Sequence, residues 1–238
     1  MSFLKNFFTN VYHEEAQTRP SSSFDALSEE QLESHLAVSN YGSFALTDAI
    51  RPSYDLKVVP KQGYRQEIYK DDESQSKVPV LMASASRDIL FEVFMELLEP
   101  LGNVVDVVLE TSHGRRGRGH QDLYREHIDV PVLKSVLWDF EELLTHDGCT
   151  GIAVLNSQAP HEVQFDEHKL LIVYSHETKL FERVLRSHDV AYDQEIKFIT
   201  EAEHVHSSSD AFVKQFDELK MQLGMDSDYS EPGLLLND

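Results

Sequence analysis

The chain has 238 residues, of which 42 are Asp or Glu and 21 are Lys or Arg, so its formal net charge is -21. Hydrophobic residues make up 41% of the chain, enough to bury the core of one good-sized domain. An acidic surface repels the phosphates of DNA and RNA, and the composition therefore excludes general nucleic-acid binding.

The only cysteine is Cys149, so no intrachain disulfide can form, which is typical of a reducing compartment. No apolar run reaches the length of a membrane-spanning helix. The sequence therefore predicts an acidic cytoplasmic protein without a membrane span.

The first predicted element is a helix over Phe3–Tyr12, where apolar residues recur at helical spacing. The apolar side chains on this face must be buried against another surface. The alternatives are the protein's own core, a protein partner or second copy of the chain, and a membrane surface. The last is disfavoured because only Lys5 would face anionic lipid.

A second helix is predicted from Ser28 to about Ser39, because Ser28 and Gln31 form a capping-box pattern. Short extended pieces are expected at 55–59 and 64–69. The polar run 71–76 then predicts a boundary. The expected parts are a helical and extended region with flexible linkers (1–77), an α/β domain (78–224) and a mobile acidic tail (225–238).

In the α/β domain, apolar runs alternate with amphipathic stretches. They predict, in chain order, strand 79–83, helix 86–101, strand 104–110, a helix from about 129, strands 151–155 and 169–174, helix 177–187, strand 195–205 and helix 209–223. Apart from an extra N-terminal βα unit and the final helix, this is the βαββαβ order of ferredoxin-like folds. We therefore predict a mixed sheet covered by helices, with a doubly wound parallel sheet as the alternative. The choice between the mixed and the parallel sheet depends on whether strands 151–155 and 169–174 pair as a hairpin.

The segment 114–119 reads Gly-Arg-Arg-Gly-Arg-Gly and is the only locally basic stretch. Arginines can hold a phosphate or carboxylate by paired hydrogen bonds, and glycines allow close backbone approach. The alternative is a surface loop whose arginines meet the protein's own acidic faces or an acidic partner. The candidate ligand-binding residues are Arg115, Arg116, Arg118, Gly117, Gly119, His113 and His120.

Histidine patterns give no metal prediction. His204 and His206 share one face of the predicted last strand, but exposed strand histidines explain them more simply. His113, His120 and His127 recur every seven residues, a spacing with little meaning in a loop. No metal and no cofactor are expected.

Two function classes remain. The first is a non-catalytic cytoplasmic interaction or regulatory module, whose Phe3–Tyr12 helix contacts a protein partner or a second copy. The alternative is an enzyme or sensor that binds a small anionic ligand, such as a phosphorylated one, through 114–119. The sequence leaves open whether the protein is an enzyme.

Overall fold

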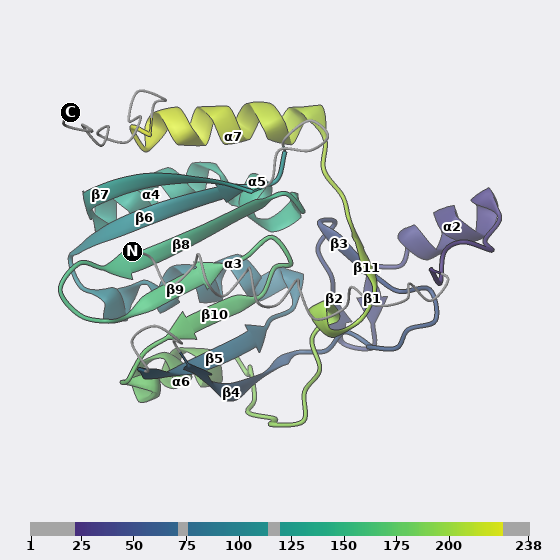
Figure 1. Cartoon of the computed structure of the whole chain (residues 1–238), viewed down its shortest axis with the longest axis horizontal. Helices are drawn as coiled ribbons and strands as arrows, with labels where there is room; N and C mark the ends of the chain where they lie inside the picture. The colour runs from purple at the N-terminus through teal and green to yellow at the C-terminus, as the bar shows by residue number, and fades with distance from the viewer. Residues whose placement is uncertain (1–21, 71–75, 114–119, 226–238) are drawn as a thin grey trace, which may run out of the picture.

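The structure is a computed structural model that describes residues 22–70, 76–113 and 120–225. Its central element is a seven-stranded sheet of order β4-β5-β10-β9-β8-β6-β7, in which all neighbours run antiparallel (Figure 1). The strands are Gly63–Lys70 (β4), Lys77–Ser84 (β5), Val104–Thr111 (β6), Gln121–Asp129 (β7), Thr150–Asn156 (β8), Glu162–Phe165 (β9) and Leu171–Tyr174 (β10).

Helices pack on one face of this sheet. Alternate strand residues such as Leu81, Val105 and Val154 form a single buried cluster with apolar residues of these helices. Figure 1 shows the helices as a layer behind the sheet, with α7 along its upper edge beside α5. They are Arg87–Leu97 (α3), Val130–Asp139 (α4), Glu141–His146 (α5), Thr178–Ser187 (α6) and Asp210–Gln222 (α7), and a 3-10 turn, Glu99–Leu101 (η1), follows α3.

The opposite face of the sheet is partly polar. Glu162 and Gln164 alternate on β9 with Val163 and Phe165, which belong to the helix-side core. Both polar side chains are nevertheless buried, and Gln164 Nε2 donates a hydrogen bond to Glu162 Oε1 at 2.6 Å. Burial raises the pKa of Glu162 to about 7, although the bond from Gln164 opposes the rise.

The pKa of Glu162 gives a prediction for stability. A carboxyl whose folded-state pKa is raised binds protons more tightly in the folded protein than in the unfolded chain. The free energy of unfolding therefore falls as pH rises from about 4.5 to above 7, where the buried Glu162 side chain must ionise. We expect Glu162→Gln, which keeps the acceptor for Gln164, to be more stable than the wild type at pH 8 by on the order of 3 kcal/mol. At pH 4 the two proteins should differ little. Denaturant unfolding at both pH values measures this, and an equal difference at both would contradict it.

Two short ribbons lie beside the main sheet (Figure 1). In the second, the strand 204–206 pairs antiparallel with the strand 50–52. Through this pairing, the segment that precedes β4 in the chain lies against the segment that precedes α7. The elements of this part are Glu29–Leu36 (α2), Asn40–Tyr41 (β1), Phe44–Ala45 (β2), Ile50–Pro52 (β3), Ile199–Glu201 (η2) and His204–His206 (β11).

The described chain is thus mixed α/β, with an antiparallel main sheet and six α-helices among the described residues. The parallel alternative has no support, and neither the ferredoxin-like order nor the extra N-terminal unit is confirmed. The segments 151–155 and 169–174 do not pair with each other, because β9 lies between β8 and β10.

The capping box is confirmed. The Ser28 side chain accepts a hydrogen bond from the Gln31 N–H, and the Gln31 side chain accepts one from the Ser28 N–H. The predicted helix 86–101 is also present, as α3 followed by η1, and it stops at Gly102, whose φ of 94° suits glycine.

Three predictions were wrong. The expected strand 195–205 contains only the 3-10 turn η2 and the first two residues of β11, which pairs with β3 and not with the main sheet. The expected extended piece 55–59 has no strand. Part of the stretch left without an element between the expected strand 104–110 and the helix from about 129 is the edge strand β7, whose charged side chains concealed its pairing with β6.

The predicted division into parts stays a prediction, although β4 precedes the expected boundary and pairs with β5 beyond it. The helix Phe3–Tyr12, the Gly/Arg segment 114–119 and the tail after 225 lie outside the described residues. Within the described ranges, every helix is too short or too polar to cross a lipid bilayer.

Candidate metal centre

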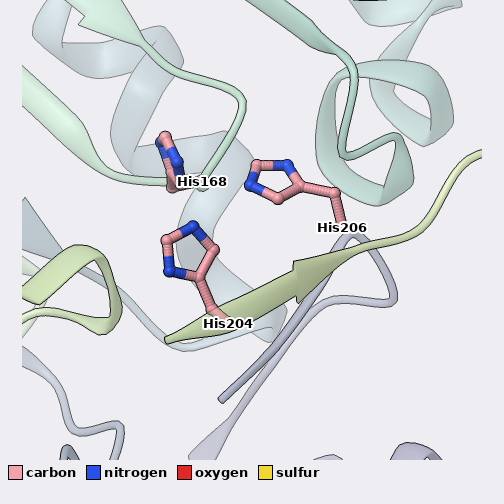
Figure 2. Close-up of side chains that lie close together, drawn as sticks. All are labelled: His168, His204 and His206. Atoms are coloured by element: carbon pink, nitrogen blue, oxygen red, sulfur yellow. The ribbon is translucent and has the colours of Figure 1, made fainter. Parts of the chain in front are cut away.

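Three histidines from two separate parts of the fold lie together. His204 and His206 project from β11, and His168 comes from the turn between β9 and β10 (Figure 2). The ring centroids are 5.0 Å apart for His168 and His204, 4.8 Å for His168 and His206, and 5.1 Å for His204 and His206. Each ring offers one nitrogen to a group whose members all lie within 4.8 Å of one another.

The β9–β10 turn fixes His168. The Lys169 N–H donates to the Asp166 carbonyl at 3.0 Å, and the Asp166 N–H donates to the Leu170 carbonyl at 3.1 Å. Lys169 has a φ of 62°, a left-handed conformation that glycine usually supplies in such turns. A side chain held in this conformation is costly, and such outliers concentrate at functional sites.

The β11 strand fixes the other two histidines. Residues at i and i+2 on a strand point to the same side, so His204 and His206 both face the turn. The Gly148 N–H donates to the Ser207 carbonyl at 2.8 Å, which holds the end of β11 against the start of β8. A Cβ at Gly148 would lie 2.3 Å from the Ala49 carbonyl oxygen, so only glycine allows this approach.

All three rings use Nδ1 in a hydrogen bond to an acceptor. His168 Nδ1 lies 2.9 Å from Asp166 Oδ2, His204 Nδ1 lies 2.8 Å from the Ala202 carbonyl, and His206 Nδ1 lies 2.6 Å from the Gly148 carbonyl. Since carbonyls and carboxylates only accept, each Nδ1 carries the proton. Nε2 of each neutral ring therefore has a free lone pair, which is the form that binds metals.

The environment favours neutral rings at His204 and His206. Burial is the main cause that lowers the pKa of both, and the neighbouring His168 lowers them further. Burial also opposes the protonation of His168, but the Asp166 carboxylate outweighs it and raises the pKa of His168. A metal ion at Nε2 would take the place of that second proton.

Carboxylates give the surroundings a negative character. Asp166 is 4% exposed, and its Oδ1 accepts a hydrogen bond from the Leu170 N–H at 2.7 Å. Burial would raise its pKa, but the charge of His168 and these hydrogen bonds hold the pKa below the usual range. Lys169 is the nearby cation: burial lowers its pKa to about 8, against the attraction of Asp147, Asp166 and Glu167. A second cation near these carboxylates is electrostatically favourable.

The spacing of the rings fits a metal ion of ordinary size. Tetrahedral zinc with Zn–N bonds of about 2.0–2.1 Å requires nitrogens about 3.3 Å apart. Because the nitrogens here are at most 4.8 Å apart, binding would draw them together by no more than about 1.5 Å. Small rotations of the side chains supply that movement.

Of the residues predicted from sequence to bind an anion, the structure describes His113 and His120. His113 Nε2 lies 2.8 Å from Asp147 Oδ2, and His120 Nε2 lies 3.8 Å from Glu167 Oε1. Neither belongs to the group of three histidines. The other predicted residues, Arg115, Arg116, Arg118, Gly117 and Gly119, lie outside the described residues.

Part of this site is visible in the sequence, but not as a metal site. His204 and His206 were placed correctly on one strand face, but as exposed surface residues, whereas His204 is half-buried. His168 lies 36 positions earlier than His204, in a turn whose residues carry no recognised metal motif. The one available signal was the pair Asp166 and His168 just before the apolar run 170–174, since a carboxylate beside a histidine often orients a metal ligand.

Comparisons with known proteins add no relative. No protein-family model matches the chain, no curated protein matches it, and no solved structure matches its fold.

Proposed function

We propose that the protein binds a divalent transition metal of the zinc class through Nε2 of His168, His204 and His206. The observation that carries this proposal is the common state of the three rings, in which every Nδ1 is occupied by an acceptor and every Nε2 is left for a cation. A chance cluster of surface histidines has no reason to share this arrangement.

The donor set favours zinc. Imidazole nitrogens suit Zn²⁺, Cu²⁺, Ni²⁺ and Fe²⁺, whereas Mg²⁺ and Ca²⁺ prefer oxygen ligands. Three neutral ligands in a compact group fit the tetrahedral preference of zinc with one position left over. The proposal therefore excludes a calcium or magnesium site at these histidines.

The leftover position favours a reactive centre over a closed structural one. Structural zinc sites have four protein ligands, whereas catalytic sites have three and keep one position for water or substrate. His206 is exposed, so solvent reaches this side of the group. When bound there, zinc would supply Lewis acidity to a small oxygen ligand. The chain's own part is to orient the rings through Asp166, Ala202 and Gly148.

The test of the proposal is a metal titration of the full chain, with competition against a chromophoric chelator. We expect one Zn²⁺ equivalent whose binding depends on His168, His204 and His206. A protein that binds no Zn²⁺ above the level of a triple His→Ala variant of these residues would contradict it.

Asp166 offers a more specific prediction. Both of its oxygens accept hydrogen bonds, Oδ2 from His168 and Oδ1 from the Leu170 N–H. The amide of Asp166→Asn has only one accepting oxygen, so it cannot serve both donors. Loss of such an orienting partner typically costs about 10–100-fold in metal affinity, and we expect that loss in the zinc titration. Asp48→Asn, on an exposed carboxylate beside His146, is the control and should bind zinc like the wild type.

The functions predicted from sequence stay predictions. The interaction-module prediction depends on the helix Phe3–Tyr12, and the anion-binding prediction depends mainly on residues 114–119, all outside the described residues. A metal centre is compatible with either, because a bound zinc ion also attracts anionic ligands.

A further inference from the structure

A second group of donor atoms lies beside the three histidines. It contains His113, Asp147 and Cys149, and one ligand atom from each lies within 4.8 Å of the others. The two groups adjoin at Gly148, which lies between Asp147 and Cys149 and whose carbonyl accepts the hydrogen bond from His206. None of these three residues belongs to the histidine group.

The sheet register brings the three residues together. Thr111 of β6 pairs with Thr150 of β8, and the Ser112 N–H continues the ladder by donating to the Cys149 carbonyl at 2.9 Å. Beyond this last bond, His113 lies opposite the segment 147–149 at the end of α5. The donors therefore come from two elements that pairing holds rigidly in place.

The second group contains buried polar atoms that lack hydrogen bonds. The Asp147 side chain is 0% exposed and that of His113 is 9% exposed. Among the described residues, Asp147 Oδ1 and His113 Nε2 have no hydrogen-bond partner of good geometry. His113 Nε2 is 2.8 Å from Asp147 Oδ2, but its orientation falls outside that of a hydrogen bond. Buried polar atoms without partners are rare and costly, and a cation between them would satisfy both.

The remaining contacts leave Nε2 of His113 and the carboxylate of Asp147 available as metal ligands. Thr111 Oγ1 lies 2.9 Å from His113 Nδ1, and Thr150 Oγ1 donates to Asp147 Oδ2 at 2.5 Å. Burial opposes ionisation of Asp147, yet the neighbouring side chains of His113, Ser208 and Thr150 hold its pKa below the usual range. Asp147 is thus a carboxylate inside the protein, where an anion needs a positive partner.

We infer that His113, Asp147 and Cys149 form a second metal site, which binds a divalent transition metal with affinity for sulfur, such as Zn²⁺ or Co²⁺. One nitrogen, one oxygen and one sulfur donor suit these ions and not Mg²⁺ or Ca²⁺. When the metal–sulfur bond forms, the Cys149 thiol loses its proton to solvent. The site is separate from the three histidines and does not depend on them.

Cobalt titration of the full chain tests this inference, because a thiolate bound to Co²⁺ gives a charge-transfer absorption in the near ultraviolet that imidazole does not give. Cys149 is the only cysteine, so this absorption reports on that residue alone. We expect two equivalents of Co²⁺ and the thiolate band in the wild type. Cys149→Ser should lose the band and one equivalent, whereas the double variant His204→Ala and His206→Ala should keep the band and lose the other equivalent.

The outcomes separate the two proposals. If saturating Co²⁺ gives no thiolate band in the wild type, the second site is overturned, and an equivalent that depends on His204 and His206 still supports the first. If the band appears but neither equivalent depends on those histidines, the second site stands and the first is overturned. A single equivalent that either variant removes would show one composite site and overturn the inference of a separate one. The wild-type spectrum decides the main point even if a variant fails to fold.

Discussion

Simultaneous replacement of His204 and His206 by alanine is expected to lower the affinity for Zn²⁺ by about 10³-fold or more. Four-ligand zinc sites bind with about 10–16 kcal/mol, so that each ligand contributes about 3 kcal/mol. The two substitutions remove two of three nitrogens and leave His168 with its Asp166 partner. The measurement is a competition titration with a chromophoric chelator, made in a Cys149→Ser background so that the second site does not contribute.

The matched control is His176→Ala. His176 is an exposed histidine that precedes α6 and does not belong to either group of donors. Its removal should leave zinc affinity unchanged, which separates the loss of two particular ligands from the loss of histidine in general. Equal affinities of the double variant and of His176→Ala would contradict the first metal site.

Zinc is expected to raise the melting temperature of the protein. A ligand that binds only the folded state at 1,000 times its Kd stabilises that state by about 4.1 kcal/mol. For a chain of 150–250 residues, each kcal/mol corresponds to about 2–4 °C, so the expected rise is about 8–16 °C. The effect has a structural source, because the metal would join the β9–β10 turn to β11, two segments more than 30 residues apart in sequence.

Thermal unfolding with and without Zn²⁺ measures this rise in Cys149→Ser, with chelator added afterwards to reverse it. Mg²⁺ is the control ion and should leave the melting temperature unchanged, because it binds imidazole poorly. An equal rise in the variant that lacks His204 and His206 would show that zinc acts elsewhere.

Local patterns in the sequence predicted much of the scaffold. The capping box at Ser28 and the stop at Gly102 depend on residues within one turn of the chain, and both are confirmed. Strands with continuous apolar runs, such as β8 and β10, were also placed correctly within a few residues. Such features need no knowledge of what lies across the fold.

Features that depend on distant neighbours were missed. On β9, Glu162 and Gln164 alternate with core residues, so these polar residues made the stretch resemble a loop that leads into the next strand. β7 is an edge strand with charged side chains, and only its pairing with β6 makes it a strand. The expected strand 195–205 failed because its apolar residues Ile196 and Phe198 cover the sheet from an irregular segment instead.

The metal centre could not be predicted from the sequence, because it too depends on residues that are distant along the chain. His204 and His206 are a local pair, but their significance depends on His168. The tautomer of His206 also depends on the Gly148 carbonyl, which reaches His206 only because glycine lets Ala49 and Ser207 approach it closely. None of these contacts follows from residue spacing.

X-ray absorption spectroscopy at the zinc edge can show whether the three histidines bind zinc, because it reports the ligands of the bound metal themselves. The sample is the Cys149→Ser protein loaded with one equivalent of Zn²⁺ and freed of excess metal. We expect nitrogen or oxygen neighbours at about 2.0–2.1 Å, with the outer-shell scattering of three imidazole rings, and no sulfur. A zinc environment of oxygen neighbours without imidazole scattering would contradict the proposal that His168, His204 and His206 form a metal centre.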